Sequence, residues 1–281
     1  MKSLLVFVAL IALVLGMWIA PARRQRQAVA AMQGWGCVVW YDVASSPIRP
    51  GTRLPGPDWL TNSLGIDYTS NVVEVRAGWA ATPWHETESS QHPFTDTGLA
   101  WVRDLPNLER LFLFGTQVTD AGLKHLSGLS RLESLRLGGT GITDLGLAHV
   151  AGLKNLKVLD LSGTQVTDTG LEQLCGLVNL EYLRLYGTDV TDVGLVHLAG
   201  LTKLELLELD HTQISDAGLA HLTGLRRLKM LFLDGTQITD SGLAPLVKLT
   251  GLKHLRLEGT SVSKLGCETL IRDLPMCHVW R

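Results

Sequence analysis

The chain contains 281 residues, of which 46% are hydrophobic and only 6% are aromatic. Its 25 basic and 27 acidic side chains give a formal net charge of −2 at pH 7. This near-neutral balance gives no electrostatic reason to expect nucleic acid as a partner. The four cysteines are too few and too scattered to form a disulfide scaffold.

The chain begins with an apolar segment. Residues 3–20 carry no charged side chain, and as a helix of about 1.5 Å per residue they would span roughly 27 Å, close to the hydrocarbon thickness of a bilayer. The small residues at 20–22 fit a signal-peptide cleavage site, whereas the length of the run and the arginines within 23–26 fit a retained anchor better. We therefore predict that residues 1–22 anchor a single-pass membrane protein, with export after cleavage as the alternative. The flanking charges leave the side of the membrane open.

Residues 23–72 are predicted to form a juxtamembrane helix and an α/β N-terminal cap. The stretch RRQRQAVAAMQ at 23–33 reads as a helix that leaves the membrane, and CVVWYDV at 37–43 reads as a strand. Residues 44–57 are rich in proline and glycine, which predicts a loop. The stretch DWLTNSLG at 58–65 reads as a short helix.

One ten-residue pattern then recurs seven times at intervals of 24 residues, without an insertion. Two leucines spaced by two residues predict a strand at its start, and the aspartate that ends most copies is a suitable N-cap for a short helix. A single unit buries too few aliphatic side chains to be stable alone, so successive units must stack into a solenoid. The copies begin at 111, 135, 159, 183, 207, 231 and 255 and read LFLFGTQVTD, LRLGGTGITD, LDLSGTQVTD, LRLYGTDVTD, LELDHTQISD, LFLDGTQITD and LRLEGTSVSK.

A further, degenerate repeat is predicted before the regular ones. Phe94 begins a stretch in phase with the repeats, and Val73-x-Val75 is the best candidate for its strand pair. An insertion at about 79–93 then separates the strand from the helix and is expected to project as a loop. The leucine-rich region therefore covers residues 73–264.

Residues 265–281 are expected to close the last coil. Val279 lies 24 residues after Leu255, which predicts one last edge strand at 279–281. Cys267 and Cys277 are near each other in sequence and could pair if the domain is exported; the sequence leaves this open.

The threonine at the sixth position of the pattern suggests a bond from coil to coil. Its hydroxyl carries a single donor proton, and a stack of such hydroxyls could form a ladder along the solenoid. The seven residues are Thr116, Thr140, Thr164, Thr188, Thr212, Thr236 and Thr260.

The motif LxxLxLxxTxV from Leu108 resembles a leucine-rich repeat with threonine in the usual place of asparagine. Its continuation DxGLxxL from Asp120 resembles the ribonuclease-inhibitor-like and cysteine-containing subclasses. The whole chain resembles the membrane-anchored leucine-rich-repeat proteins of planctomycete bacteria, which similarly join a hydrophobic N-terminus, an arginine-rich stretch, a WYD strand and GTx[VI]TD repeats. The resemblance implies an α/β solenoid: a horseshoe with a parallel concave sheet and short convex helices, behind an N-terminal transmembrane helix.

No group of reactive side chains indicates catalysis. GGTGITD at 138–144 lacks the lysine and the ribose-binding acid of a phosphate-binding loop. Cys175 replaces small residues of other copies, which predicts a buried, inert thiol. Four histidines share one helical position, and parallel side chains do not form the tetrahedral ligand set of a metal. We expect no enzyme activity, no metal and no cofactor; the four are His125, His149, His197 and His221.

The strand residues between the leucines are expected on the concave face. One column of them alternates in sign, and Arg136, Asp160, Arg184 and Glu208 are predicted to pair across neighbouring strands. Exposed pairs of this kind contribute roughly 0–1 kcal/mol each. They would mainly neutralise the face.

A second group on the same face is aromatic and aliphatic, with acidic residues alongside. Such a composition resembles a protein-recognition surface, and we predict that it binds a polypeptide of basic character. We call this group the concave patch: Tyr182, Tyr186, Leu206, Met230 and Phe232, with Asp210 and Asp234 as its acidic rim.

The sequence therefore predicts a non-catalytic, monomeric, membrane-anchored protein that recognises a protein or peptide through its concave face. A structural envelope protein without a specific ligand is one alternative. An adaptor in regulated protein degradation is another, although no F-box-like segment precedes the repeats. The identity of the partner is not encoded in any motif.

Overall fold

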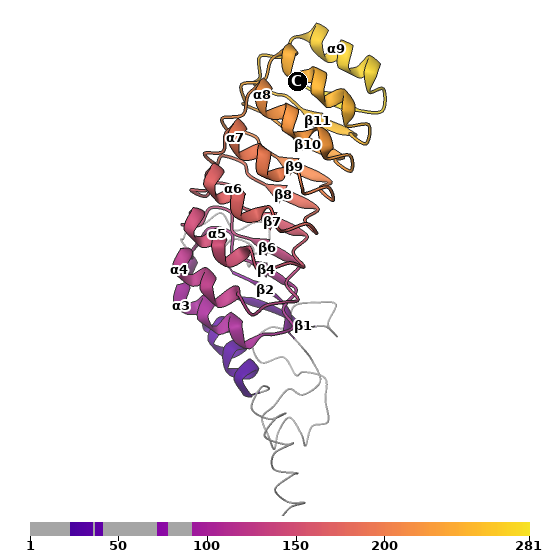
Figure 1. Ribbon diagram of the computed structural model, residues 1–281. Helices are drawn as coiled ribbons and strands as arrows, with labels where there is room; N and C mark the ends of the chain where they lie inside the picture. The colour runs from indigo at the N-terminus through magenta and orange to yellow at the C-terminus, as the bar shows by residue number, and fades with distance from the viewer. Residues whose placement is uncertain (1–22, 36, 42–71, 78–91) are drawn as a thin grey trace, which may run out of the picture.

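The computed structural model describes residues 23–35, 37–41, 72–77 and 92–281. The 24-residue units form successive coils of one elongated solenoid, with the strands along one side and the helices along the other (Figure 1). The stacking of one unit per coil follows from the strict period, because each coil buries its leucines against the next.

Several predicted segments fall outside the described residues. They are the apolar segment at 1–22, the loop at 44–57, the short helix at 58–65 and nearly all of the insertion at about 79–93. Within the described ranges, no helix combines the length and the hydropathy needed to cross a bilayer.

Ten strands form one sheet in the order β1-β2-β4-β6-β7-β8-β9-β10-β11-β12. β1 is antiparallel to β2, and every later neighbour is parallel. The bounds are β1 (Val38–Tyr41), β2 (Val72–Arg76), β4 (Arg110–Phe112), β6 (Ser134–Arg136), β7 (Val158–Asp160), β8 (Tyr182–Arg184), β9 (Leu206–Glu208), β10 (Met230–Phe232), β11 (His254–Arg256) and β12 (His278–Trp280).

Short helices cover the other side of each coil, and a two-stranded sheet joins β3 (His92–Thr95) to β5 (Thr116–Gln117). The helices have at most ten residues because a 24-residue coil must also hold a strand and two turns. They are α3 (Asp96–Leu99), η2 (Ala100–Asp104), α4 (Asp120–Leu123), η3 (Lys124–Leu126), α5 (Asp144–Val150), α6 (Asp168–Leu174), α7 (Asp192–Leu195), η4 (Val196–Leu198), α8 (Asp216–Leu219), η5 (Ala220–Gly224), η6 (Asp240–Lys248) and α9 (Lys264–Asp273).

The repeat leucines form one continuous core. In the register of the sheet, Leu111 lies opposite Leu135, which lies opposite Leu159. All three are fully buried, as the strand pattern predicts. Burying a leucine side chain contributes about 1.5–3 kcal/mol, so the leucine ladder dominates the stability of the solenoid.

The first coil has a different register from the predicted one. β2 places Val75 opposite Leu111, so the residues equivalent to Leu111 and Leu113 are Val75 and Ala77, both fully buried. The predicted pair, Val73 and Val75, is two residues too early. Side chains two apart in a strand share a face, so the hydrophobic pattern alone could not distinguish the two registers.

The segment before the repeats contributes a helix and a strand, as predicted for 23–33 and 37–43. Residues 23–34 are helical, and Met32 is fully buried in the same core as Val39 of β1. β1 covers the outer edge of β2, so the first coil is paired on both sides and the antiparallel β1 forms this edge of the sheet.

The C-terminal strand is also formed, one residue earlier than the predicted 279–281. β12 pairs with β11, and Val279 lies opposite Leu255. Cys267 and Cys277 are free and buried, and burial raises the pKa of the Cys277 thiol to about 11.

The predicted hydroxyl ladder is wrong. Thr116 Oγ1 donates to the Leu113 carbonyl of its own coil at 2.8 Å, and all seven threonines make the equivalent bond. A hydroxyl has one proton to donate, and the carbonyl three residues earlier takes it. The threonines therefore close the turn after each strand and do not link the coils.

The aspartate that begins the helical segment in seven of the coils makes the bond between coils instead. Asp144 Oδ1 accepts from the backbone N of Thr167 at 2.8 Å, and its Oδ2 accepts from Thr167 Oγ1 at 2.7 Å. The same pair of bonds recurs seven times; we call the series the aspartate ladder. Its members are Asp96–Thr119, Asp120–Thr143, Asp144–Thr167, Asp168–Thr191, Asp192–Ser215, Asp216–Thr239 and Asp240–Ser263.

Asp120 is therefore not the N-cap of its helix, although the sequence predicted that role. The N-cap of α4 is the preceding residue, Thr119. In the helix of the next coil, Thr143 has extended backbone angles and its Oγ1 accepts from Leu145 N, so the threonine is the N-cap. Asp120 is the first helical residue of its own coil, and its carboxylate faces the neighbouring coil. An isolated repeat cannot reveal this, because the acceptor and the donor are 23 residues apart.

Candidate functional site

The concave face is built from strand side chains that the leucine core leaves free. Arg184 lies between two acids, with Nη1 3.8 Å from Asp160 Oδ2 and Nε 3.4 Å from Glu208 Oε2. This part of the predicted alternating column is confirmed. The predicted pair between Arg136 and Asp160 is not formed: within the described chain, Arg136 has no ion pair with Asp160.

Asp160 is turned away from Arg136 by its own coil. Its Oδ1 accepts from the backbone N of Ser162 at 3.1 Å and from Ser162 Oγ at 2.7 Å. Asp160 is only 4% exposed. With Oδ1 held by Ser162, its other oxygen, Oδ2, faces Arg184. The sequence could not show this choice, because both arginines occupy neighbouring strands of Asp160.

Arg136 lies over an aromatic ring instead. Its Cζ is 4.9 Å from the ring centroid of Phe112, and the Cζ of Arg76 is 5.0 Å from the same centroid. The Nε of Arg136 is buried and has no hydrogen-bond partner among the described residues. Burial lowers the pKa of Arg136, and the nearby charge of Arg184 lowers it further.

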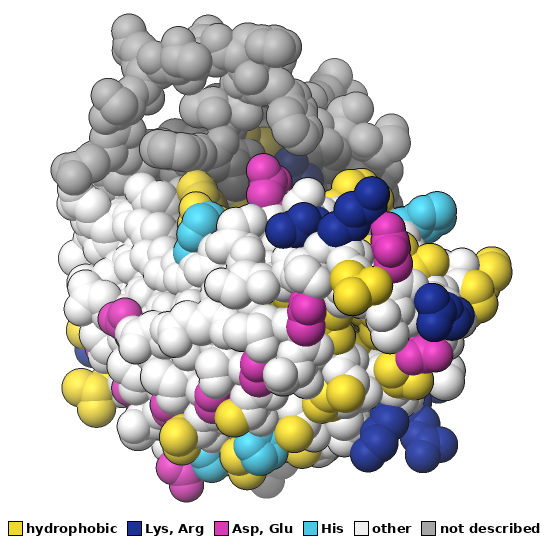
Figure 2. Space-filling view, turned by 90° about the horizontal axis from the view of Figure 1, so that it is seen from above, with side chains coloured by type: hydrophobic (Ala, Val, Ile, Leu, Met, Phe, Trp, Pro, Cys, Tyr) yellow, Lys and Arg dark blue, Asp and Glu magenta, His cyan; other side chains and the backbone are white. Residues whose placement is uncertain are grey.

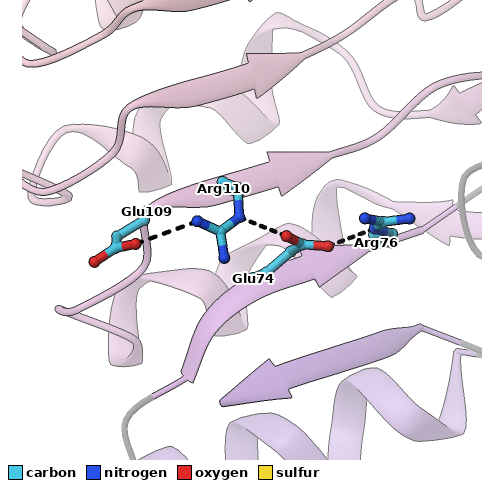
Figure 3. A network of polar contacts seen from close by, with 4 residues as sticks. All are labelled: Glu74, Arg76, Glu109 and Arg110. Carbon is cyan, nitrogen blue, oxygen red and sulfur yellow. Dashed lines mark hydrogen bonds and ion pairs between the residues drawn. The ribbon is translucent and has the colours of Figure 1, made fainter. Parts of the chain in front are cut away.

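The arginines at the N-terminal end of the face are held by one buried acid. Glu74 is 5% exposed, and its two oxygens accept from Arg76 Nε and Arg110 Nε, each at 2.5 Å. Arg110 Nη1 also lies 3.3 Å from Glu109 Oε2. Figure 3 shows these four residues as a chain of alternating charges across β2 and β4.

The apolar members of the concave patch lie on adjacent strands. Tyr182 of β8 is in register with Leu206 of β9, which is in register with Met230 of β10. Leu206 is 6% exposed, whereas Tyr186, which follows β8, is 45% exposed.

Two further residues lie against the concave patch, and sequence reasoning did not assign either of them to it. His211 packs edge-on against Tyr186 with ring centroids 5.2 Å apart, and it occupies with φ 55° the turn position where Gly187 and Gly235 have φ 62° and 64°. Arg256 lies over Phe232, 5.4 Å from the ring centroid. The unusual histidine in the pattern LELDHTQISD was the signal that could have found His211.

The prediction of an exposed acidic rim is wrong. Asp210 and Asp234 are only 3% and 6% exposed. Asp210 Oδ1 accepts from the backbone N of Asp234 at 2.6 Å, Asp234 Oδ1 accepts from the backbone N of Glu258 at 2.8 Å, and Asp234 also pairs with Arg256. Both carboxylates are thus used inside the solenoid, because the backbone amide of the next coil lies within their reach.

An aromatic group extends the face toward the C-terminus. His254 of β11 stacks on Trp280 of β12 at 5.4 Å between ring centroids, and His278 is 5.9 Å from His254. Trp280 is 49% exposed. Figure 2 views the molecule from this end, where apolar side chains lie among basic and acidic ones.

The remaining candidate residues do not converge. Cys175 is exposed, which corrects the predicted burial: it follows the last residue of α6, where the chain turns at the surface. The four histidines of the helical column lie partly or fully exposed on the convex side. In the described part of the chain, no three His, Cys, Asp or Glu side chains are grouped to hold a metal ion.

Glu208 should make stability depend on pH. Its burial, followed by the charges of Asp210 and Asp160, raises its pKa above the ordinary value of 4.5, although Arg184 opposes the shift. A raised folded-state pKa contributes stability that is present below the unfolded value and is lost as the pH rises through the folded value. As the pH rises above the ordinary value of 4.5, Glu208→Gln should therefore lose less stability than the wild type, in urea unfolding followed by circular dichroism.

Glu172→Gln, which removes an exposed carboxylate of α6, is the matched control and should keep the wild-type pH profile. If stability depended on pH in the same way for Glu208→Gln and the wild type, the raised pKa assigned to Glu208 would be contradicted.

The fold defines a class: a stack of strand–turn–helix coils with parallel strands on one face and leucines inside is a leucine-rich-repeat solenoid. A family model described as "Leucine-rich repeat region" matches residues 99–269. This is more than half of the chain, and the chain belongs to the leucine-rich-repeat family. A search of curated proteins gave no match.

Two solved structures from Listeria monocytogenes are similar. The internalin C2 structure has 28% sequence identity and a TM-score of 0.57, and the match covers 78% of this chain and 89% of that chain. The internalin inlF structure has 23% identity and a TM-score of 0.54, with 69% of this chain and 59% of that chain covered. The chain thus spans about three fifths of the inlF structure, and at this identity the likeness concerns the fold.

Proposed function

We propose that this leucine-rich-repeat protein is a non-catalytic scaffold that binds a protein or peptide through its concave face. The observation that carries the proposal is the exposed Tyr186, which follows β8, on the same face as Tyr182 of β8 and as Met230 and Phe232 of β10, with β9 between the two strands. Aromatic residues and methionine are enriched at the centres of protein interfaces. The repeat itself requires none of these side chains, since other coils carry glycine, serine or charged residues in their places.

The proposal includes a membrane tether and a monomeric state. The uncharged run at 3–20 and the arginines that follow it support a single-pass anchor. The helix at 23–34 would then connect the membrane to the first coil. The resemblance of the motifs to membrane-anchored planctomycete proteins with ribonuclease-inhibitor-like or cysteine-containing repeats supports this proposal. Export after cleavage is the alternative.

Two substitutions test the proposed surface. Tyr186→Ala combined with Phe232→Ala should lower the yield of a captured partner at least about tenfold, because truncating two aromatic residues at an interface typically removes more than about 1.4 kcal/mol of binding. Proximity labelling of the intact protein, followed by pull-down of the labelled partner, measures this yield.

Val193→Ala is the control, since Val193 is 66% exposed on α7, on the convex side. It should leave the yield unchanged. Equal capture by the double variant and the wild type would sink the concave-face proposal, and labelling without any reproducible partner would favour the structural role.

A further inference from the structure

The concave strands carry five arginines in the described residues, and four of them have an acidic partner. Arg76 and Arg110 pair with Glu74, Arg184 pairs with Asp160 and Glu208, and Arg256 pairs with Asp234. The fifth, Arg136 of β6, is the exception. It has no ion pair with any described residue, and its Nε has no hydrogen-bond partner there.

We infer that Arg136 receives a carboxylate from the polypeptide that binds the concave face. The inference rests on the proposed function and specifies the chemistry of the partner. It also reverses the sequence-based expectation of a basic partner, because Asp210 and Asp234 already serve backbone amides and Arg256.

The guanidinium of Arg136 is held in place before any partner arrives. Phe112 lies under it at 4.9 Å, and β4 and β7 flank its strand on either side. A partly buried charge without a counter-ion is unfavourable, and the lowered pKa of Arg136 reflects that burial together with the charge of Arg184. A carboxylate would satisfy the planar guanidinium with two parallel hydrogen bonds, at little cost in ordering because the side chain is already fixed.

The surroundings favour a monoanion on a polypeptide over a phosphate chain. Asp160 lies on the next strand in register with Arg136, and Glu74 lies two strands away on the other side, on β2. Glu74 is already paired with Arg76 and Arg110, and Asp160 with Arg184, so these pairs offer no further positive charge to a multiply charged ligand. A single carboxylate of the partner would form an ion pair with Arg136, the one arginine that has no acidic partner among the described residues of the face.

The position of Arg136 also sets the spacing of the recognised sequence. β6 and β8 are separated by one strand, and Tyr182 is in register with Ser134, two residues before Arg136. Two strand spacings of roughly 4.8 Å and two residues of roughly 3.3 Å along the strand put Arg136 and Tyr182 about 12 Å apart. An extended peptide that crosses the strands advances about 3.3 Å per residue. The partner should therefore carry an acidic residue about three to four positions from an apolar or aromatic residue that contacts the concave patch.

Peptide display on the full-length protein tests the inference with a defined probe. A random twelve-residue peptide library is selected against the wild type, Arg136→Gln and Arg136→Glu, each held in detergent. The wild type should enrich peptides that contain Asp or Glu about three to four positions from an apolar residue. Arg136→Glu should enrich Lys or Arg at that position, because the charge of the receiving group is reversed.

One enriched peptide is then synthesised, together with its amide version in which Asp or Glu becomes Asn or Gln. Arg136→Gln should bind the acidic peptide at least about tenfold more weakly than the wild type does, and the amide peptide should not distinguish the two proteins. Arg136→Lys keeps the charge but loses the bidentate geometry, so its affinity should fall between them. Arg131→Gln, an exposed arginine before β6, is the matched control and should bind like the wild type.

The outcomes separate the inference from the proposed function. Peptides that depend on Tyr186 and Phe232 but show no acidic preference, or equal affinity for Arg136→Gln, would overturn the inference and leave the concave-face function intact. If the wild type enriches no peptide above a blank surface, both fall. Circular dichroism of each variant confirms that the change in binding does not come from unfolding.

Discussion

Replacing Gly146 by alanine should destabilise the solenoid by about 2–4 kcal/mol, even though alanine is the better helix former by about 1 kcal/mol. A Cβ on Gly146 would overlap Asp120 Oδ1 of the preceding coil and lie 3.0 Å from Leu123 Cδ1. The carboxylate would have to move, which weakens its bonds to Thr143 N and Oγ1. Overpacking costs about 1–3 kcal/mol, and each hydrogen bond to a charged group contributes about 1.5–3 kcal/mol.

Gly152→Ala is the control in the same coil, because a Cβ there would meet nothing within 4 Å. Its effect should stay within about 0.5 kcal/mol. The measurement is the urea midpoint and slope of both variants. A Gly146→Ala protein as stable as the wild type would mean that the aspartate ladder adapts to a side chain, and that the glycine is not required by it.

Removing one member of the ladder should have an effect of similar size. Asp168→Ala deletes the acceptor of Thr191 N at 2.8 Å and of Thr191 Oγ1 at 2.6 Å. The backbone N–H of Thr191 would be left without its acceptor at the junction of two coils. We expect the free energy of unfolding to fall by about 2–3 kcal/mol. Native-state hydrogen exchange should show the loss locally, as at least about tenfold faster exchange of the Thr191 amide.

Asp189→Ala is the matched control, since it removes the same charge from an exposed position in the same coil as Thr191. It should leave the exchange of Thr191 unchanged. A double-mutant cycle with Thr191→Val separates the hydroxyl bond from the amide bond. Additive effects of Asp168→Ala and Thr191→Val would show that the two side chains do not interact.

The architecture could be predicted almost completely from one repeated pattern. A period of 24 residues, with Leu111 and Leu113 in strand spacing, determines the register of neighbouring strands because only an in-phase stack buries both leucines. The same reasoning placed Val279 opposite Leu255 at the last strand. It failed by two residues at Val75, where the repeat is degenerate and a shift of two keeps the same face inside.

The concave face could be assigned to columns, but its internal bonds could not. Whether Asp160 pairs with Arg136 or Arg184 depends on how its carboxylate is held by Ser162. Asp210 looked like an exposed charge and is instead bonded to the next backbone amide. These choices depend on distances of a few ångströms between coils, which a linear pattern does not contain.

Burial on the helical side was misjudged for a related reason. Cys175 occupies a column of small residues, and small size indicated a tight interior site. The column lies at the end of each helix, where the chain turns at the surface. Small residues there fit a turn.

The aspartate ladder bears on how such a protein can change its length. Every coil from Asp96 to Asp240 offers one acceptor to the coil after it, and every coil from Thr119 to Ser263 offers the matching donors to the coil before it. Duplicating or deleting a whole 24-residue unit therefore leaves no bond of the ladder unmatched. The first coil shows where a coil can instead be longer: 36 residues separate Val75 from Leu111, yet the two stay in register and Asp96 still bonds Thr119, because the extra residues lie between strand and helix. Evolution can lengthen or shorten the concave surface in steps of one strand without a compensating change elsewhere.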